Sequence, residues 1–302
     1  MIVNYLVTRE GEDTLVSLLR DWAPELRNHL RILRYEDLFT AKTVPKGPYI
    51  FSDIERLGPV AAERMAQVWK QLDGERLHLL NHPTRSLRRY ELMRVLHERG
   101  INRFNVFRLT EGRMPTRYPV FIRFENDHNG SRSPLLGSEA DLRRTIDVFM
   151  DKGVSRERIL ICEFLDTSGG TGLYRKYSYL KLGSAILPRH LLFSRHHIVK
   201  LPDLDDDDLL AEEVAFVEAM PYRDESAKIF EIAGIDYGRI DFSVDDGRIQ
   251  VWEINTNPMI FTPPEPGDKR IPLGRRFAQA YAHAMIAVAS SSGRADDGKA
   301  AG

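Results

Sequence analysis

Hydrophobic residues recur along the chain with two different spacings, and segments of the two kinds follow one another in turn. Short apolar runs of the kind that form strands occupy residues 1–8, 48–53 and 76–83. Apolar residues three and four positions apart, as on one face of a helix, occupy residues 13–30 and 58–72. Strands that alternate with helices predict an open α/β sheet for this part of the chain.

The alternation continues towards the C-terminus. A helix over residues 86–101 is predicted to begin with Ser86 as its cap and to end at Gly100. Further helices are predicted at residues 139–153, 209–220 and 224–235. Strands are predicted at residues 118–125, 158–165, 237–244 and 248–258, with two or three more within 172–200. The acidic run at residues 205–208 is interpreted as the solvated start of a helix, where carboxylates suit the helix dipole, rather than as a metal cluster.

The composition limits the classes of partner. Of the 302 residues, 42% are hydrophobic and 29% charged, which is ordinary for a soluble globular protein of two or three domains. The formal net charge of −1 gives no field that would favour nucleic acid or an anionic membrane. No apolar run approaches the ~18 residues of a membrane helix, and the N-terminal residues lack a signal-peptide pattern. The single cysteine, Cys162, is expected to pack as a small apolar residue. We therefore expect a cytoplasmic protein that binds neither nucleic acid nor membrane, and leave open whether it forms a homo-oligomer.

The stretch "YGRIDFSVDDGRIQVWEIN" predicts two strands joined by a short turn. Side chains alternate between the two faces of a strand, so Arg239 and Asp241 share one face of the first strand. By the same rule Val251, Glu253 and Asn255 share one face of the second strand. Carboxylate and amide oxygens in such a place would be exposed strand-end groups or the ligands of a cation.

The length of the turn decides whether the acidic residues of the two strands meet. A two-residue loop would put Asp241 and Glu253 on opposite faces, whereas a three-residue loop would put them on one face. The loop at residues 245–247 ends in glycine, which suits the positive φ that the three-residue loop needs. That register places Arg239 opposite Glu253, with Asp241 diagonally across at a Cα distance of roughly 7–8 Å. With Asn255 beside them, the two carboxylates form a set of hard donors for Mg²⁺ or Mn²⁺.

The spacing of this hairpin resembles that of a known superfamily. Arg239-x-Asp241, followed after eleven residues by Glu253-x-Asn255-x-x-Pro258, is similar to the metal-binding hairpin of ATP-grasp enzymes. The spacing is closest in kind to the branches of ribosomal-protein glutamate ligases, glutathione synthetase-like enzymes and D-alanine–D-alanine ligases. In that superfamily the acids and the amide hold Mg²⁺ against ATP, and the arginine stabilises the phosphoryl group during transfer.

The resemblance spans residues 81–258 and implies an α/β architecture with the ATP-grasp fold. An N-terminal α/β pre-grasp domain, expected at residues 1–80, precedes two α+β grasp domains that clasp ATP. The central grasp subdomain is expected at residues 81–165. The C-terminal grasp subdomain, with the metal site, is expected at residues 166–289, and a disordered tail at residues 290–302.

The resemblance also implies where the phosphates of ATP would bind. The superfamily places two cations on them, usually lysines; Arg89, at the start of a helix, and Arg123, at the end of "PVFIR", stand in those positions. Arginine keeps the charge and pairs well with phosphate, but its reach differs. The loop at residues 126–138 stands where a glycine-rich loop covers the phosphates, and it has fewer glycines than usual. Within it the backbone N–H groups of residues 129–131 would face an anion.

The segment "ILICEFLD" resembles the hinge that binds adenine. Glu163 would approach the adenine amino group, and the backbone of Phe164 and Leu165 would bond the base edge. Asp166 is a candidate for the ribose. A glutamate within an otherwise apolar strand needs a polar partner in any case.

The reaction implied by the resemblance is the ATP-dependent joining of a small acid to an amine through an acyl phosphate. Arg175 and Arg189 are fourteen residues apart, as are arginines that face substrate and phosphate in the glutamate-ligase branch. They would act together with Arg239, although both also suit an ordinary strand surface. The segment at residues 259–270 is bulkier than the superfamily pattern, so the acid and the amine are not identified. A kinase that phosphorylates a metabolite, and a nucleotide-binding module without activity, are the alternatives.

The adjacent His196 and His197 should face opposite sides of a strand and so not form a metal site together.

Overall fold

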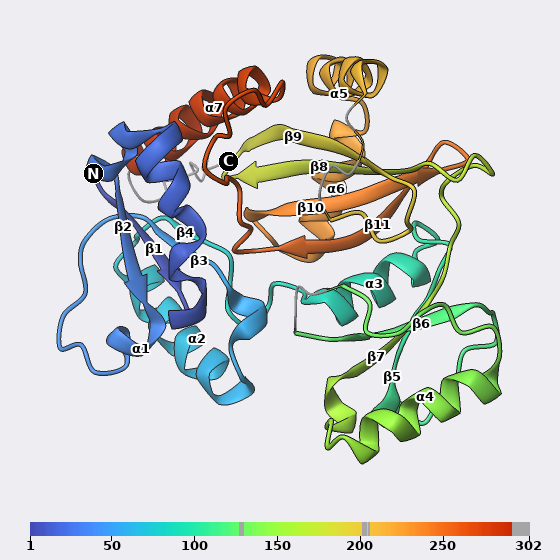
Figure 1. Ribbon diagram of the computed structural model, residues 1–302. Coiled ribbons are helices and arrows are strands. Elements are labelled where there is room, and N and C mark those ends of the chain that lie inside the picture. The colour runs from blue at the N-terminus through green and yellow to red at the C-terminus, as the bar shows by residue number, and fades with distance from the viewer. Residues whose placement is uncertain (127–129, 201–203, 205, 292–302) are drawn as a thin grey trace, which may run out of the picture.

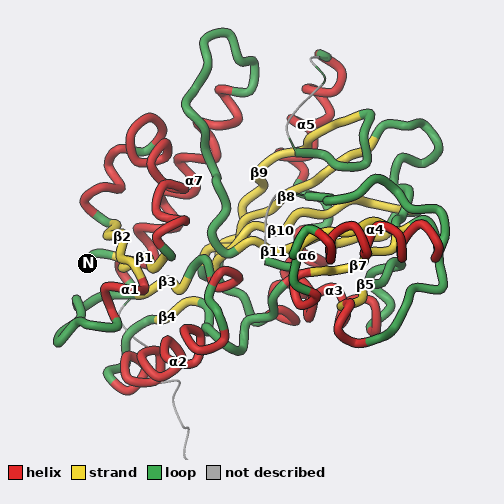
Figure 2. The backbone as a smooth tube through the Cα atoms, turned by 60° about the horizontal axis from the view of Figure 1, so that its bottom comes forward, coloured by secondary structure: helices red, strands yellow, loops and turns green. Residues whose placement is uncertain are grey.

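A computed structural model describes residues 1–126, 130–200, 204 and 206–291 of the chain. These residues form three β-sheets, with strand orders β2-β1-β3-β4, β5-β7-β6 and β11-β10-β8-β9. The first sheet lies to the left of the other two in both views (Figures 1 and 2). None of the described helices is long and apolar enough to cross a membrane.

The N-terminal sheet is parallel, as the alternation of strands and helices predicts. Its strands are β1 (Val3–Val7), β2 (Leu30–Arg34), β3 (Tyr49–Phe51) and β4 (Leu79–Leu80), and its α-helices are α1 (Tyr35–Leu38) and α2 (Pro59–Gly74). The predicted helix over residues 13–30 is wrong as a single element. The chain there forms three short helical segments, Arg9–Leu15, Leu18–Trp22 and Pro24–Asn28. Pro24 lacks an N–H and disfavours a helical conformation before it, so Ala23 adopts φ −146° and the helix breaks.

The central sheet is antiparallel, with β7 between its two neighbours. It consists of β5 (Val106–Arg108), β6 (Val120–Phe124) and β7 (Ile159–Glu163), with helices α3 (Arg89–Glu98) and α4 (Glu139–Asp151). Alternate residues of β7 pack towards the two helices: Leu160 and Cys162 join a cluster with α3, and Ile159 and Ile161 join one with α4. The packing role predicted for Cys162 is therefore confirmed, and burial raises the pKa of its thiol to about 11.

The C-terminal sheet carries helices on one face. Its strands are β8 (Tyr174–Leu182), β9 (Ala185–Ser194), β10 (Tyr237–Asp245) and β11 (Arg248–Asn255), and its helices are α5 (Asp207–Ala219) and α6 (Arg223–Ala233). Asp206 caps α5 by accepting bonds from the next backbone N–H groups, which confirms the helix-start interpretation of this part of the acidic run. Asp205 lies outside the described residues. The cap predicted at Ser86 is wrong, because its hydroxyl instead donates to Gly234 O at the end of α6.

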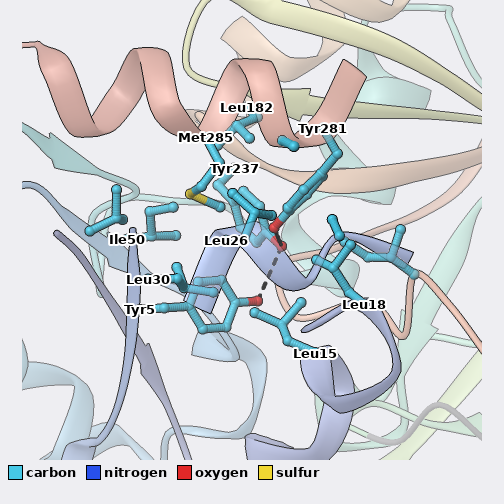
Figure 3. Packing of buried hydrophobic residues seen from close by; sticks show 14 of the residues in the cluster. Tyr5, Leu15, Leu18, Leu26, Leu30, Ile50, Leu182, Tyr237, Tyr281 and Met285 are labelled. Carbon is cyan, nitrogen blue, oxygen red and sulfur yellow. Dashed lines mark hydrogen bonds between the residues drawn. The ribbon is translucent and has the colours of Figure 1, made fainter. Parts of the chain in front are cut away.

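A twenty-residue helix, α7 (Ile271–Ser290), was not predicted, and it ends where the tail was expected to begin. Residues 292–302 lie outside the described part of the chain. Helix α7 packs in one core with strands of both the N-terminal and the C-terminal sheet. In this core Tyr5 and Tyr237 share a hydrogen bond of 3.2 Å, and Tyr237 and Tyr281 share one of 3.1 Å (Figure 3). The domain limits given above stay predictions, and this core crosses the first of them.

Candidate functional site

A cavity of about 310 Å³ lies between the central and the C-terminal sheets. Some of its lining residues are apolar or aromatic, together with one histidine: Phe121, Phe164, Leu165, Tyr174, His197, Ile198, Val199 and Trp252. Others are charged or polar and include Arg123, Lys176, Lys200, Arg239, Asp241, Ser243, Glu253 and Asn255. Such a cavity can take a ligand with a flat apolar end and an anionic end.

The hairpin of β10 and β11 brings its acidic residues to the cavity, but its loop and its register differ from the prediction. Its loop has two residues, Asp246 and Gly247, both with positive φ (50° and 71°), and not the predicted three. Such a loop would leave the two carboxylates on opposite faces. The register then shifts by one residue at a β-bulge, where Trp252 has no partner on β10. Asp241 therefore lies directly opposite Glu253.

The bulge confirms the shared face but corrects the pairing. Arg239 lies opposite Asn255, not opposite Glu253 as predicted. Val251 does not share the face of Glu253; it is buried in the core under the helices. Trp252 turns over the site, where its ring stacks on Phe104 and its Nε1 donates to Ser243 Oγ (2.9 Å).

Each carboxylate of the site contacts cationic side chains. Asp241 accepts two hydrogen bonds from Arg239, at 2.8 and 3.0 Å, and lies 3.6 Å from Lys176 Nζ. Burial alone would raise the pKa of Asp241, but the charges of Arg239 and Lys176 hold it below its ordinary value. Glu253 pairs with Arg89 and lies 3.6 Å from Arg123. Asp241 is therefore an anion at neutral pH, and both carboxylates are already balanced by positive charge.

Some of the residues predicted for the nucleotide line the cavity and others do not. Arg123, Phe164 and Leu165 line it. The Phe164 N–H donates to Pro119 O (3.0 Å), so this group is engaged within the protein. Arg89 lies behind the cavity, buried between Glu253 and the carbonyl of Glu125.

Glu163 and Asp166 are not among the described residues that line the cavity. The Glu163 carboxylate accepts the N–H of Asn105, the residue before β5, at 2.9 Å. The Asp166 carboxylate accepts the N–H of Ser168 at 2.9 Å and so shapes its own loop. Each carboxylate thus has a partner within the protein, and the roles that the resemblance implies for them stay predictions.

The two arginines predicted to face the substrate point elsewhere. Arg175 leaves the opposite face of β8 and forms a bidentate ion pair with Glu212 (2.6 Å). Arg189 is the extra residue of a β-bulge on β9. Its guanidinium donates to Ile260 O (3.1 Å) and lies over the rings of Phe261 and Phe277. Burial, and then the charge of Arg239, lower the pKa of Arg189 to about 10.

Two cationic residues of the cavity, Lys176 and Lys200, were not among the predicted site residues. Lys176 follows Arg175 and so takes the cavity face of β8 by simple alternation. Lys200 lies against the loop after β6: a Cβ on Gly130, which has φ +81°, would be 2.9 Å from its Cε. Gly130 and Ser131 line the cavity, while Asn129 lies outside the described residues. Of the two adjacent histidines only His197 lines the cavity and His196 is exposed, but both lie beyond β9, which ends at Ser194, so alternation along a strand is not the reason.

The sequence matches no protein-family model and no curated protein. Solved structures are similar over nearly the whole length. D-alanine–D-alanine ligase from Bacillus anthracis complexed with ATP is 12% identical, with a TM-score of 0.55 and 97% of both chains covered. A RimK domain protein ATP-grasp from Sphaerobacter thermophilus is 14% identical, with a TM-score of 0.53, 96% of this chain and 100% of that chain covered.

The chain has the ATP-grasp fold. The fold predicted from the hairpin is thereby confirmed, whereas identities this low leave the reaction to be argued from the residues. Within this ATP-grasp fold, the described residues contain no group of three or more His, Cys, Asp or Glu side chains placed to hold a metal ion. The set that fits one is Asp241, Glu253 and Asn255: two opposed carboxylates and an amide, all hard oxygen donors that line one cavity.

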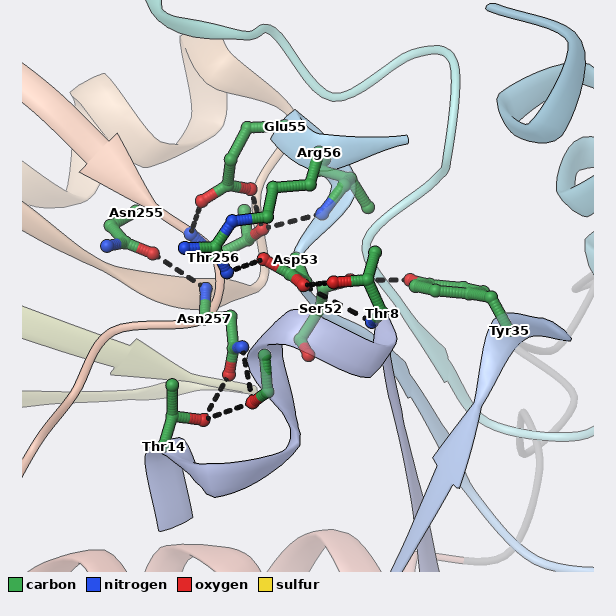
Figure 4. Close-up of polar contacts among 12 residues, drawn as sticks. Thr8, Thr14, Tyr35, Ser52, Asp53, Glu55, Arg56, Asn255, Thr256 and Asn257 are labelled. Carbon is green, nitrogen blue, oxygen red and sulfur yellow. Dashed lines mark hydrogen bonds and ion pairs between the residues drawn. The ribbon is translucent and has the colours of Figure 1, made fainter. Parts of the chain in front are cut away.

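The segment after Asn255 ties this site to the N-terminal sheet (Figure 4). The backbone N–H of Thr256 (3.1 Å) and its hydroxyl both donate to Glu55. The side chain of Asn257 donates to Gly11 O (3.0 Å), and its backbone N–H donates to Asn255 Oδ1 (2.8 Å). The orientation of the amide in the candidate metal set thus depends on contacts across the molecule.

Proposed function

We propose that the protein is an ATP- and Mg²⁺-dependent ligase that joins a carboxylate to an amine through an acyl phosphate. The observation that carries this proposal is the set of charged side chains that line the cavity. Two carboxylates and an amide face one space there, together with the cations Arg123, Lys176, Lys200 and Arg239. An ATP-grasp fold around that space supports a nucleotide as its ligand.

The cavity suggests how the nucleotide would lie. The aromatic part beside Phe164, Leu165 and Tyr174 would take the base, and the cations would take the phosphates. Arg123 and Arg239 stand on opposite sheets, β6 and β10, so both sheets would hold the phosphate chain. We propose no direct contact between the nucleotide and the side chains of Glu163, Asp166 and Arg89, because none of the three lines the cavity.

The metal would be held by Asp241, Glu253 and Asn255, and when bound it would neutralise phosphate charge. In this structure the carboxylates of Asp241 and Glu253 are already neutralised by neighbouring arginine and lysine side chains, as a bound metal ion would neutralise them. A metal ion alone would have to compete with them. A metal–nucleotide complex brings phosphates for the same cations, so we propose that metal and nucleotide bind together.

The proposed chemistry needs positioning and charge rather than a side-chain nucleophile. A carboxylate oxygen of the acid attacks the γ-phosphorus, and the bond to the bridging oxygen breaks to release ADP. The amine nitrogen then attacks the acyl carbon, the carbon–oxygen bond breaks, and phosphate leaves while the amine gives up a proton. Arg239 would face the charge that develops on the transferring group. Arg189, whose guanidinium donates to Ile260 O, would support residues 259–261 rather than bind the acid, and Arg175 is excluded from binding it by its pairing with Glu212.

The experiment is ATP turnover with pooled small acids and amines, in the presence of hydroxylamine. An acyl phosphate is intercepted as a hydroxamate, so we expect hydroxamate in an amount that follows ADP release. Asp241→Asn and Glu253→Gln should abolish both products while the protein stays folded, since each removes a charged oxygen donor. A stable phosphorylated product from an alcohol or a phosphate, without hydroxamate, would replace the ligase by a kinase.

A further inference from the structure

Four polar side chains stand in one row across the C-terminal sheet. His190 on β9 pairs with Ser178 on β8, Ser178 pairs with Asp241 on β10, and Asp241 pairs with Glu253 on β11. Directly opposite residues of antiparallel strands have Cβ atoms about 4.5–5.5 Å apart, close enough for side chains to bond in series. The row therefore extends the candidate metal set by two residues, neither of which lines the cavity.

Two β-bulges create this row. On β9 the register shifts at Arg189, and on β11 it shifts at Trp252. Without the first bulge His190 would face the other side of its strand, and without the second Glu253 would do so. Both irregularities lie next to the row and re-aim one side chain each towards it.

The hydrogen bonds of the row have a direction. Both oxygens of Asp241 accept bonds from Arg239, so this group is a carboxylate and can only accept. Ser178 therefore uses its single proton to donate to Asp241 Oδ1, at 2.6 Å. The 2.9 Å bond between Ser178 Oγ and His190 Nε2 must then run the other way, with Nε2–H as the donor.

We propose that Ser178 and His190 are positioning residues, which hold Asp241 in the orientation that binds a divalent cation together with the nucleotide. This inference rests on the function proposed above. Ser178 is fully buried, and a buried hydroxyl that had no donor behind it would be free to rotate away from the carboxylate. The Nε2–H of His190 fixes the hydroxyl. Burial, and then the charges of Arg189, Arg239 and Lys176, lower the pKa of His190. The bond to Ser178 is what selects the tautomer with the proton on Nε2.

The test compares the binding of a non-hydrolysable ATP analogue, AMP-PNP, by calorimetry in excess Mn²⁺ and in EDTA. Ser178→Ala and His190→Leu should weaken binding of the Mn²⁺ complex by ~10-fold or more, the usual effect of losing a partner of a metal ligand. Binding in EDTA should not change. His190→Gln, whose amide can still donate, should recover most of the loss. Ser226→Ala is the matched control, because its buried hydroxyl has no hydrogen-bond partner within the described part of the chain.

A second measurement does not depend on any variant being folded. ¹⁵N NMR of the wild-type imidazole should show the proton of His190 on Nε2. A proton on Nδ1 alone would overturn the inference, as would Mn²⁺-dependent binding that is equal in Ser178→Ala, His190→Leu and the control. If the wild type and Asp241→Asn bind the Mn²⁺ complex equally, the proposed metal site itself fails, and this inference fails with it.

Discussion

Replacing Gly11 by alanine tests the link between the N-terminal sheet and the candidate site. A Cβ on Gly11 would lie 2.4 Å from both Asn257 Nδ2 and Asp53 Oδ2. Both neighbours are buried and bonded, so neither can simply swing into solvent. Asn257 in turn bonds Asn255 Oδ1, so a displaced Asn257 should also disturb the candidate metal ligand.

The expected size follows from these contacts. Overpacking a well-filled interior costs about 1–3 kcal/mol. Moving Asn257 also breaks or stretches its bond to Gly11 O, and a lost hydrogen bond costs about 0.5–1.5 kcal/mol net. The sum is about 2–4 kcal/mol of the free energy of unfolding. At an unfolding entropy of about 2.1 cal/mol/K per residue, a chain of 302 residues loses about 1.6 °C per kcal/mol, so the midpoint of thermal unfolding should fall by about 3–6 °C.

The assay is thermal unfolding followed by circular dichroism, with the same substitution elsewhere as control. Gly74 is the last residue of α2, and a Cβ there would have nothing within 4 Å. Gly74→Ala should therefore raise stability, by about 0.4–1 kcal/mol, because alanine loses less conformational freedom. The reasoning is refuted if Gly11→Ala unfolds at the wild-type temperature, or if the two variants shift the midpoint alike.

Three further outcomes are expected. Arg123→Ala should weaken the binding of ATP far more than that of adenosine, and equal weakening of both would move Arg123 away from the phosphates. Lys176→Ala should lower ATP turnover, while Arg175→Ala should leave it near the wild-type level because Arg175 pairs with Glu212 on the opposite face; equal losses would contradict the register of β8. The thiol of Cys162, with a pKa of about 11, has on the order of one molecule in a thousand ionised at pH 8, so it should react with a disulfide reagent far faster in guanidinium than in the native protein. Fast labelling of the native protein would contradict its burial.

The sequence by itself determined the order of the elements and the chemistry of the hairpin. Local rules were enough there, because the alternation along β10 puts Arg239 and Asp241 on one face whatever lies beside the strand. The spacing to Glu253 and Asn255 then indicated the ATP-grasp fold that the solved structures confirm. The helix α7 was not recognised, and Pro24 was underrated as a helix breaker, although both signals are present in the sequence.

Only the tertiary structure decided which side chains face the site. A period of two is lost at every bulge, and bulges at Arg189 and Trp252 depend on how neighbouring strands pair, which no local pattern contains. Glu253 was therefore predicted on the correct face of its strand, although the prediction assumed a three-residue loop and the structure has a two-residue loop followed by a bulge. Lys176, and not Arg175, reaches the cavity because pairing with β10 selects one face of β8 for the site. The close fit of Gly11 against Asn257, 246 positions later, likewise exists only when the sheets are assembled.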